Sequence, residues 1–415
     1  MTNDFDALIV GGGPAGATTA VLLAQAGWKV AIIEKTPFPR RKVCGEFISE
    51  TTWPLLRQLG VADELSGIAG PVVRRVGLYA GNAVITTNMP GSATQHADGG
   101  RAVGREHLDT LLLKRAATCG ATVLQPWTLA GFTSIGDHYH CNLAEKSGRL
   151  TREIRALFIV GAHGSWEPGP LPTQVPRIPA NAADLFGFKA HFLHGVLPAD
   201  LMPLIAFPGG YGGMVHTDGD RVSLSCCIRR DHLELCRRRW PHVRAGVAVL
   251  AHINAHCKGV ADALATATLD HHWLSAGPLR TGIRSFGGDG IFAVGNAAGE
   301  AHPIIAEGIS MAIQSACLLC DQLVGPRDKP LTREVLDSVH NAYETAWRRN
   351  FSRRIHVAAL FAHLFMRPLG ARMASAALRY APQLLNVGAQ WSGKTHVLRH
   401  NGNSGLARSL GHRVT

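Results

Sequence analysis

Short apolar runs recur along this chain and predict a parallel sheet that is covered on both faces. Ala7–Val10, Lys29–Ile33, Leu157–Val160 and Ile291–Val294 are each mainly apolar over four or five positions. Strands of a parallel sheet are buried on both faces, so they read as continuous apolar runs rather than as alternating ones. We therefore expect these four runs to be buried strands.

Helical periodicity separates and follows these runs. Ala15–Ala26 is rich in Ala and Leu and predicts a helix that Gly27 ends, because glycine readily adopts the left-handed conformation found there. An amphipathic helix is predicted from Gly104, with Leu108, Leu111 and Leu112 on one face, before a strand at Thr122–Leu124. Further helices are predicted over four stretches: Thr51–Leu65, His232–Cys257, Ile309–Leu323 and Asn341–Lys394, the last broken at Pro368 and Pro382.

Between Asp184 and Arg229 the apolar positions alternate with a period of two, which is typical of a half-buried strand. Phe186, Phe188 and Phe192 follow this alternation, and Arg221–Ile228 repeats it. The sequence predicts an antiparallel sheet that forms one wall of a pocket. Its apolar strip, with Met214, is predicted to be core rather than substrate contact. A hairpin is expected from Tyr139–Leu143 and Glu153–Val160, and Val72–Asn88 contains further strand-like runs.

The first apolar run leads into a glycine-rich turn with candidate chemistry. Gly11, Gly13 and Gly16 form the pattern G-x-G-x-x-G between the strand and the helix. Such glycines let the backbone approach a diphosphate, and the helix start offers free N–H groups and a positive dipole end. Glu34 ends the next strand, where an acidic side chain accepts bonds from ribose hydroxyls and repels a 2′-phosphate. The unit predicts a site for FAD or NAD rather than NADP.

A second turn of the same kind lies far along the chain. Gly295–Gly299 follows the apolar run at Ile291–Val294, and His302–Gly308 precedes the helix predicted at Ile309. This arrangement again places backbone N–H groups and a helix N-terminus near an electron-rich ligand.

An irregular basic loop, Thr36–Glu46, follows the ribose acid. Its two prolines exclude regular structure, and Gly45 permits close approach of a ligand to the backbone. Cys44 follows Arg40, Arg41 and Lys42, and basic neighbours make a thiol more reactive. A small packed residue against the cofactor is the alternative for Cys44. Arg105, at the start of its helix, contacts a phosphate or an adenine, or forms a surface ion pair.

Composition narrows the class of protein. The chain has 415 residues, of which 46% are hydrophobic, and carries a formal net charge of +12 with arginines spread along its length. A basic soluble surface accounts for this charge; the alternatives are an anionic substrate, an acidic carrier protein or an anionic membrane. No recognised nucleic-acid motif accompanies the charge, so nucleic-acid binding is not expected.

The nine cysteines show no framework spacing, and the first residues read as a strand rather than as a signal peptide. We therefore expect a reducing, cytoplasmic location. No apolar run reaches the length of a membrane span. His252 and His256 are four residues apart, but a third ligand with suitable spacing is missing, so no metal site is predicted.

Together these segments resemble the FAD-dependent oxidoreductases of the para-hydroxybenzoate hydroxylase type. Within that group they look most like the branch of geranylgeranyl reductases and flavin-dependent halogenases. The resemblance rests on Gly11–Gly16 with Glu34, Arg105, Ala162–Gly164 and Gly295–Gly308, and on a Cys44-Gly45 segment like that of the reductases. It implies that Arg105 contacts FAD, that Asn296 bonds the ribityl chain or diphosphate, and that Ala306–Ile309 lie under the flavin pyrimidine.

The chain also departs from that family at informative positions. Asn296 and His163 stand where the family has Asp, and Ala306 replaces a usual Gly. The halogenase Trp-x-Trp-x-Ile-Pro motif and a matching lysine are not found, which disfavours halogenation. Because the chain has a single dinucleotide fingerprint, NADH or NADPH would bind transiently as electron donor, or electrons would come from a partner protein.

The predicted fold is α/β: a Rossmann-like FAD-binding domain with an inserted antiparallel substrate-binding sheet and a C-terminal helical segment. Residues 1–80, 100–170 and 280–330 are expected to form the FAD-binding domain, 81–99 and 171–279 the insert, and 331–415 the helical region. Candidate catalytic residues are Cys44 and His302. The candidate cofactor-binding residues are Gly11, Gly13, Pro14, Ala15, Gly16, Glu34, Lys35, Lys42, Cys44, Gly45, Arg105, Asn296, Pro303, Ala306, Glu307, Gly308 and Ile309.

The expected function is that of an FAD-dependent monooxygenase that hydroxylates an apolar aromatic or polyketide-like substrate in specialised metabolism. A geranylgeranyl-reductase-like enzyme acting on a carbon–carbon bond is one alternative, and a non-catalytic flavin-binding redox sensor is another. The substrate is expected to be small and apolar, and either free, carrier-bound or delivered from a membrane. The apolar stretch Val357–Phe365, flanked by arginines, is interpreted as a helix packed over the sheet or as a lid that rests on a membrane.

Overall fold

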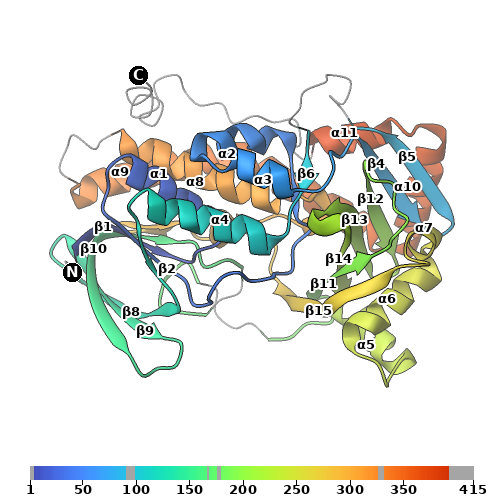
Figure 1. The fold of residues 1–415 in the computed structure, drawn as a ribbon, viewed down its shortest axis with the longest axis horizontal. Coiled ribbons are helices and arrows are strands. Elements are labelled where there is room, and N and C mark those ends of the chain that lie inside the picture. Colours follow the sequence, from blue (N-terminus) through green and yellow to red (C-terminus); the bar gives the residue numbers. More distant parts are fainter. Residues whose placement is uncertain (1–3, 90–98, 166–167, 175–178, 326–330, 392–415) are drawn as a thin grey trace.

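A computed structural model describes residues 4–89, 99–165, 168–174, 179–325 and 331–391. It contains two large β-sheets that lie side by side, with helices packed on each (Figure 1). Residues 90–98 of the predicted insert and 392–415 of the predicted helical region lie outside the described residues. The α/β fold class expected from the sequence is confirmed.

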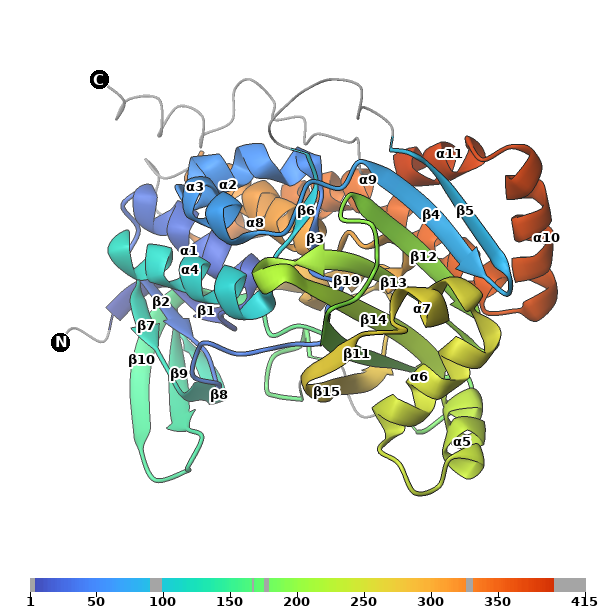
Figure 2. The same cartoon turned by 45° about the vertical axis from the view of Figure 1, so that its right-hand side comes forward.

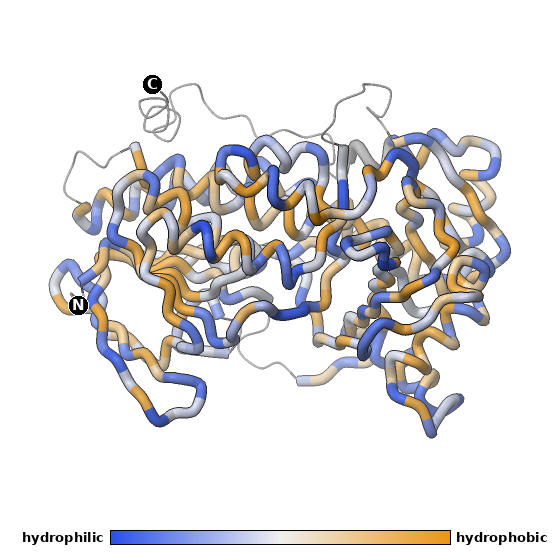
Figure 3. The backbone as a smooth tube through the Cα atoms, viewed as in Figure 1, coloured by the Kyte–Doolittle hydropathy of each residue, from blue (hydrophilic) through white to orange (hydrophobic). Residues whose placement is uncertain are grey.

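The first sheet holds the four apolar runs. Its strand order is β17-β18-β10-β1-β2-β7, and β1 pairs in parallel with both β10 and β2. The hydrophobic colouring of Figure 3 is strong on these central strands. The bounds are β1 (Asp4–Val10), β2 (Val30–Ile33), β7 (Thr122–Leu124), β8 (Trp127–Ile135), β9 (His138–Glu145), β10 (Thr151–Gly161), β17 (Gly287–Gly288) and β18 (Ile291–Ala293).

Helices cover one face of this sheet. The apolar side chains of α1, α4, α8 and the first half of α9 share one core with Ile9, Ile32 and Val160 of the strands. On the opposite face, Leu143 of β9 and Ile154 of β10 join Leu8 in a second core. The helix bounds are α1 (Pro14–Gln25), α4 (Arg105–Thr118), α8 (Gly308–Val324) and α9 (Arg333–Phe365).

The second sheet is mainly antiparallel and has the order β15-β11-β14-β13-β12-β4-β5, with β12 and β4 parallel (Figure 2). It includes β4, so residues 75–80 hydrogen-bond within the second sheet rather than the first. Its strands are β4 (Arg75–Ala80), β5 (Ala83–Asn88), β11 (Leu185–Leu193), β12 (Leu201–Phe207), β13 (Gly210–Thr217), β14 (Arg221–Arg229) and β15 (Thr268–Leu279).

The two faces of β11 have opposite chemistry. Phe188 and Phe192 are buried with Ile253 in a core made with the helices that follow β14. Lys189 and His191 point to the opposite face of β11, where both contact Glu46. Glu46 lies in the loop that follows β2. Phe188 and Phe192 are therefore core, as expected, and Phe186 packs against this core partly buried. Met214 is buried in the same core but also lines the cavity between the sheets. The covering helices are α5 (Arg230–Arg239), α6 (Ala245–His256) and α7 (Lys258–Ala263).

The C-terminal helices connect the two sheets. Trp347 and Phe351 of α9 pack into the core of the first sheet, whereas Phe365 packs against Leu78 and Ile85 of the second. Two further helices, α10 (Pro368–Tyr380) and α11 (Leu384–Trp391), follow at the outer end of the second sheet (Figure 1). Helical structure begins at Arg333, eight residues before the predicted start at Asn341.

Several predicted elements have different bounds. The helix expected over Thr51–Leu65 is two helices, α2 (Trp53–Leu59) and α3 (Ala62–Ile68), because Gly60 adopts a left-handed conformation with φ +74°. The helix expected over His232–Cys257 is likewise divided into α5 and α6. Strand β8 was not predicted. Short elements complete the fold: β3 (Phe47–Ile48), β6 (Arg101–Ala102), β16 (Gly282–Ile283), β19 (Gly299–Glu300) and 3₁₀ turns at Glu50–Thr52, Asp218–Asp220, Gly295–Ala297 and Pro303–Ile305.

Candidate functional site

A cavity of about 930 Å³ lies between the two sheets and collects almost all of the candidate residues. Gly16 and Glu307 are the exceptions among the candidates, since neither lines the cavity. The lining runs from the glycine turn after β1, past the start of α8, to apolar side chains of the second sheet and the C-terminal helices. The candidate residues in the lining are Gly11, Gly13, Pro14, Ala15, Glu34, Lys35, Lys42, Cys44, Gly45, Arg105, Asn296, His302, Pro303, Ala306, Gly308 and Ile309.

The three glycines of the first turn have different roles. Gly11 has φ +113°, and a Cβ there would lie 2.4 Å from the carbonyl oxygen of Ala162. A Cβ on Gly16 would lie 1.9 Å from the carbonyl oxygen of Gly11, so Gly16 permits tight packing of helix on turn. A Cβ on Gly13 would instead point into the space before the Arg40 and Arg105 guanidinium groups, at 3.9 and 3.7 Å. Gly13 is thus the glycine that leaves room for a ligand.

Glu34 is held in place by three donors. Its Oε2 accepts a bond from the Gly12 N–H at 3.0 Å, and its Oε1 accepts from the Thr36 N–H at 2.9 Å and Arg40 at 3.1 Å. A carboxylate has about four acceptor positions, so it can still accept from ribose hydroxyls. These contacts fix the orientation of the carboxylate at the cavity wall.

Basic side chains gather opposite the glycine turn. Arg105 is buried and binds both oxygens of Asp109 at 2.7 Å; burial opposes its charge, but Asp109 raises the pKa above its usual value. Arg105 does form an ion pair, but the prediction of a surface pair is wrong because both side chains are buried. Burial, followed by the nearby charges of Arg105 and Arg40, lowers the pKa of Lys42 to about 8.

The donor set fits a dinucleotide diphosphate. Nε of Arg40 and both Nε and Nη1 of Arg41 are buried and have no hydrogen-bond partner among the described residues. Buried donors without acceptors are costly. The Arg40 and Arg105 guanidinium groups border the open space at Gly13, and with the N–H groups at the start of α1 they suit the phosphates of a dinucleotide such as FAD.

The second turn lies beside the first, since a Cβ on Gly295 would lie 2.8 Å from the Cβ of Ala15. Val294 donates to the Gly161 carbonyl, which places Gly295 and Asn296 beside the end of β10. Ala306 has φ +53°, a conformation that glycine adopts more readily, and Gly308 begins α8. The side chain of Glu307 is fully buried and accepts a bond from Ser49, so any cofactor contact there would involve its backbone.

Asn296 and His163 face neighbouring polar groups. The Asn296 side-chain amide donates to the Ser165 hydroxyl at 2.9 Å, and the Asn296 backbone carbonyl accepts from Arg284. His163 contacts the Thr173 hydroxyl at 3.0 Å; burial, then the Arg284 charge, lowers its pKa to about 4. Both side chains are therefore uncharged at neutral pH, where the family resemblance would place carboxylates.

The two candidate catalytic residues lie at different parts of the cavity. Cys44 is partly buried beside Gly45, and its sulfur accepts a bond from the Glu46 N–H at 3.4 Å. His302 lies between the Tyr211 hydroxyl at 3.1 Å and the Thr281 hydroxyl at 3.0 Å. Burial, then His363, lowers the pKa of His302 to about 4, so its imidazole is neutral at pH 7.

The far end of the cavity is apolar. Its lining comes from β4, β12 and β13 of the second sheet and from α9, α10 and α11. Val357–Phe365 forms the C-terminal part of α9, which packs against the second sheet, in agreement with the interpretation of this stretch as a helix over the sheet. The apolar side chains of this chamber are Val76, Met202, Leu204, Ile304, Phe361, Phe365, Leu378 and Leu385.

A buried ionic network joins the two sheets beside the cavity. Glu46 contacts Lys189, and it also contacts His191 Nε2 at 2.8 Å, with all three side chains fully buried. The other ring nitrogen of His191 lies 2.7 Å from Arg41. Burial opposes the negative charge of Glu46, but Lys189 and His191 lower its pKa to about 2. Glu46 is therefore ionised and ties the loop 36–46 to β11 of the second sheet.

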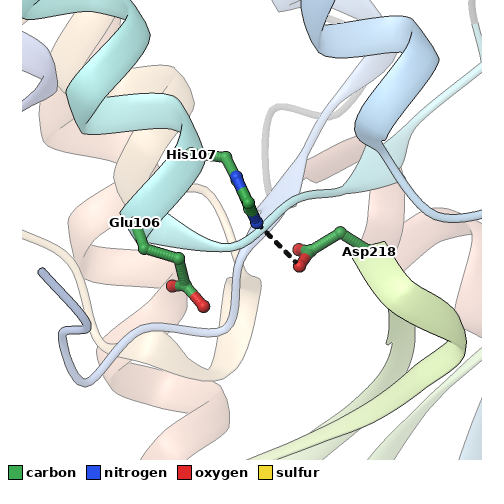
Figure 4. Close-up of side chains that lie close together, drawn as sticks. All are labelled: Glu106, His107 and Asp218. Carbon is green, nitrogen blue, oxygen red and sulfur yellow. Dashed lines mark ion pairs between the residues drawn. The ribbon is translucent and has the colours of Figure 1, made fainter. Parts of the chain in front are cut away.

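One group of side chains has the composition of a metal site. Glu106, His107 and Asp218 present ligand atoms within 4.8 Å of one another, and His107 lies 3.2 Å from Asp218 (Figure 4). The guanidinium of Arg221 already contacts both Glu106 and Asp218. A fixed cation therefore already balances the charge of these two carboxylates. The His252 and His256 rings each contact a backbone carbonyl oxygen, of Pro208 and His252.

Several residues around the cavity were not predicted. Arg40 and Arg41 belong to the same basic run as Lys42 and also line the cavity, but only Lys42 is predicted from the sequence as a candidate cofactor-binding residue. Lys189 and His191 alternate with Phe188 and Phe192 in the same strand, and this polar face of the alternation was the missed signal. Tyr211 had no signal, because its partner His302 lies 91 residues away in the sequence.

Comparison with known proteins identifies relatives of this chain. Residues 4–176 match the family model described as FAD binding domain. The chain is 26% identical over 383 residues to conditioned medium factor receptor 1 of Dictyostelium discoideum, covering 87% of this chain and 71% of that one. It is 27% identical over 352 residues to 6-methylpretetramide 4-monooxygenase of Streptomyces rimosus, covering 80% and 79%.

A solved structure shares the fold across both sheets. The myxobacterial chondrochloren halogenase CndH, described as a variant of FAD-dependent halogenases, superposes with a TM-score of 0.75. The match covers 94% of this chain and 90% of that one at 20% sequence identity. At this identity the match establishes the fold alone.

Proposed function

We propose that this chain, whose residues 4–176 match the FAD binding domain model, is an FAD-dependent monooxygenase that hydroxylates an apolar aromatic or polyketide-like substrate. The observation that carries the proposal is the single cavity that joins the glycine turn and the start of α8 to an apolar chamber. A cofactor and an apolar substrate would therefore meet in one space.

Bound FAD would supply the redox chemistry, and the residues of the chain would bind and orient it. Arg40 and Arg105 face the space that Gly13 leaves open, and Glu34 is oriented to accept ribose hydroxyls. The N–H groups at the start of α8 would stabilise negative charge on the reduced ring, because a helix N-terminus carries a partial positive charge.

The chamber would select the substrate and exclude water. Side chains such as Leu204, Phe365 and Leu378 offer no hydrogen bonds, whereas Tyr211 places a hydroxyl at the edge of the same space. An apolar body with one polar group matches this lining. The Tyr211 hydroxyl and the neutral His302 imidazole together could hold or pass a proton, since each can donate and accept.

Three alternatives remain as outcomes of the tests. Reduction of a carbon–carbon bond is favoured by Cys44, whose thiol lines the cavity beside Gly45 and could serve as proton donor. A redox sensor would use the same thiol without turnover. Halogenation is less favoured, because the lysines of the described lining, Lys35 and Lys42, lie at the nucleotide end. NADH or NADPH is proposed as transient donor, the substrate as free or carrier-bound, and the location as cytoplasmic.

The reaction class is tested with the purified protein and a panel of apolar aromatic compounds. The absorption spectrum before and after NADH or NADPH reports the flavin and its electron donor. Chemically reduced protein is then assayed for product with and without oxygen. We expect product only with oxygen, because hydroxylation takes its oxygen atom from O₂; full turnover under strict anaerobiosis would reject the hydroxylase and favour the reductase.

Cys44→Ser gives a second, independent result. For a hydroxylase we expect this variant to keep FAD and most of its activity, since Ser preserves size and the thiol takes no part. For a reductase that uses the thiol as proton donor, most turnover would be lost while FAD stays bound. Loss of FAD itself would show that Cys44 acts in cofactor packing, and the activity comparison would then be made at saturating FAD.

A further inference from the structure

The excess of basic over acidic residues is concentrated at the C-terminal end of this chain, although the arginines themselves are spread along its length. Residues 345–415 contain 11 of the 42 Lys and Arg residues and none of the 30 Asp and Glu residues. Eleven of the twelve excess charges therefore lie after Glu344. In the described part, Arg367, Arg372 and Arg379 are exposed on or beside α10.

Large apolar side chains are exposed on the same helices. The exposed fractions are 67% for Leu360 of α9, 70% for Leu369, 64% for Met373 and 92% for Tyr380 of α10. Helix α10 lies at the outer end of the second sheet (Figures 1 and 2), and it follows directly on the C-terminal end of α9 that carries Leu360. Apolar side chains beside arginines on a surface helix are typical of helices that lie at a lipid interface.

The apolar chamber reaches the surface between these helices. Leu364, Ala377 and Leu384 line the cavity and are also exposed to solvent. Phe361, Leu378 and Leu385 continue the lining inward from them. The cavity therefore has an apolar opening among the exposed apolar side chains and arginines described above.

We propose that this surface, formed by Leu360, Leu369, Met373, Tyr380 and the arginines of α10, docks on an anionic lipid bilayer and opens the chamber towards it. The inference concerns binding and stands whether or not the proposed reaction is correct. The proposed contact is a peripheral one. Within the described residues no helix is both long and apolar enough to cross a membrane.

Charge favours lipid over the other candidates for this surface. A second copy would bring the same positive surface, and residues 392–415 add four further basic residues and no acidic one. Both would be repelled by the arginines. An acidic protein would satisfy the charge, but the exposed leucines and the apolar opening fit a hydrocarbon interior better than a polar protein surface.

Flotation of the full-length holoprotein with vesicles tests the proposal. Vesicles of phosphatidylcholine alone are compared with vesicles containing about one third phosphatidylglycerol, at low and at high salt. We expect binding to the anionic vesicles that weakens at high salt, since salt screens the attraction. Absence of binding at low salt would overturn the proposal and leave an acidic protein partner as the occupant.

Paired variants locate the contact. The Leu369→Glu, Met373→Glu double variant should reduce vesicle binding at least tenfold. The control is Ile135→Glu with Leu150→Glu, at exposed sites on or near the β8–β9–β10 strands. It adds the same two negative charges and should change binding only by the effect of that charge. Arg372→Gln with Arg379→Gln should reduce binding about fivefold per arginine. Arg237→Gln with Arg238→Gln on α5 makes the same change in net charge elsewhere.

The controls decide between a docking surface and general charge attraction. Equal losses from the α10 and α5 arginine pairs would overturn the assignment to α10. A chain that ends at Trp391 should retain specific binding. If that chain lost all binding while the Leu369→Glu, Met373→Glu variant bound as well as the wild type, the contact would be assigned to residues 392–415 instead. Thermal melting of each variant confirms that the fold persists.

Discussion

Gly13 and Gly16 lie in one turn, yet substitution at each should fail for a different reason. We expect Gly13→Val to fold normally and to lose FAD, because its side chain would enter open space before Arg40 and Arg105. Gly16→Val should instead destabilise the protein, because its Cβ would collide with the Gly11 carbonyl oxygen at 1.9 Å. Flavin fluorescence and thermal melting measure the two effects separately.

Tight FAD retention by Gly13→Val would contradict the placement of the diphosphate in that space. Gly13→Ala provides a graded comparison, since its smaller side chain should weaken binding less. The Arg105–Asp109 pair belongs to the same scale: the buried carboxylate keeps the guanidinium charged and fixed towards the space that a phosphate would fill.

At the scale of elements, β11 holds the second sheet against the loop 36–46 through a buried ion pair. Lys189→Met should destabilise the protein by about 3–5 kcal/mol, because it leaves the Glu46 carboxylate buried without its cation. Adding Glu46→Gln to that variant should recover part of the loss. Denaturant unfolding measures both, and Lys258→Met, which breaks an exposed pair with Asp262, is the control with an expected effect of about 1 kcal/mol or less.

The same pair gives a pH dependence of known sign. The folded protein lowers the pKa of Glu46 to about 2, below its ordinary value, because Lys189 and His191 favour the ionised form. The resulting stabilisation is therefore fully present above the ordinary pKa and is lost as pH falls towards 2. A wild-type protein whose acid unfolding profile matches that of the Glu46→Gln, Lys189→Met variant would contradict this account.

At the scale of the whole molecule, the cavity joins both sheets and the C-terminal helices, so FAD should stabilise all three together. A ligand that binds the native state at 100 times its Kd adds about 2.7 kcal/mol of stability. We expect Tm to rise with FAD concentration by a few degrees and hydrogen exchange to slow in both β1 and β13. Gly13→Val should show neither change, and protection confined to the first sheet would contradict a shared site.

The sequence by itself determined the elements whose signal is local. Continuous apolar runs predicted the strands β1, β2, β10 and β18, and the glycine turns after β1 and β18 indicated a cofactor site on the same sheet. These signals need no long-range information, because a strand buried on both faces must be apolar throughout and a diphosphate needs glycine where backbone approaches it. The family resemblance rests on these segments and implies the α/β fold, which is confirmed, and residues 4–176 match the FAD binding domain model.

The tertiary structure decided which side chains face the cavity. Alternation in β11 shows two faces, but only packing against α6 assigns Phe188 to the core and leaves Lys189 facing Glu46, which is 143 residues away. The apolar chamber likewise depends on α10 and α11 meeting β4 and β12, which lie far from them in the chain. Sequence patterns specify that a residue is buried; which partner buries it depends on contacts between distant segments, and those contacts exist only in the folded chain.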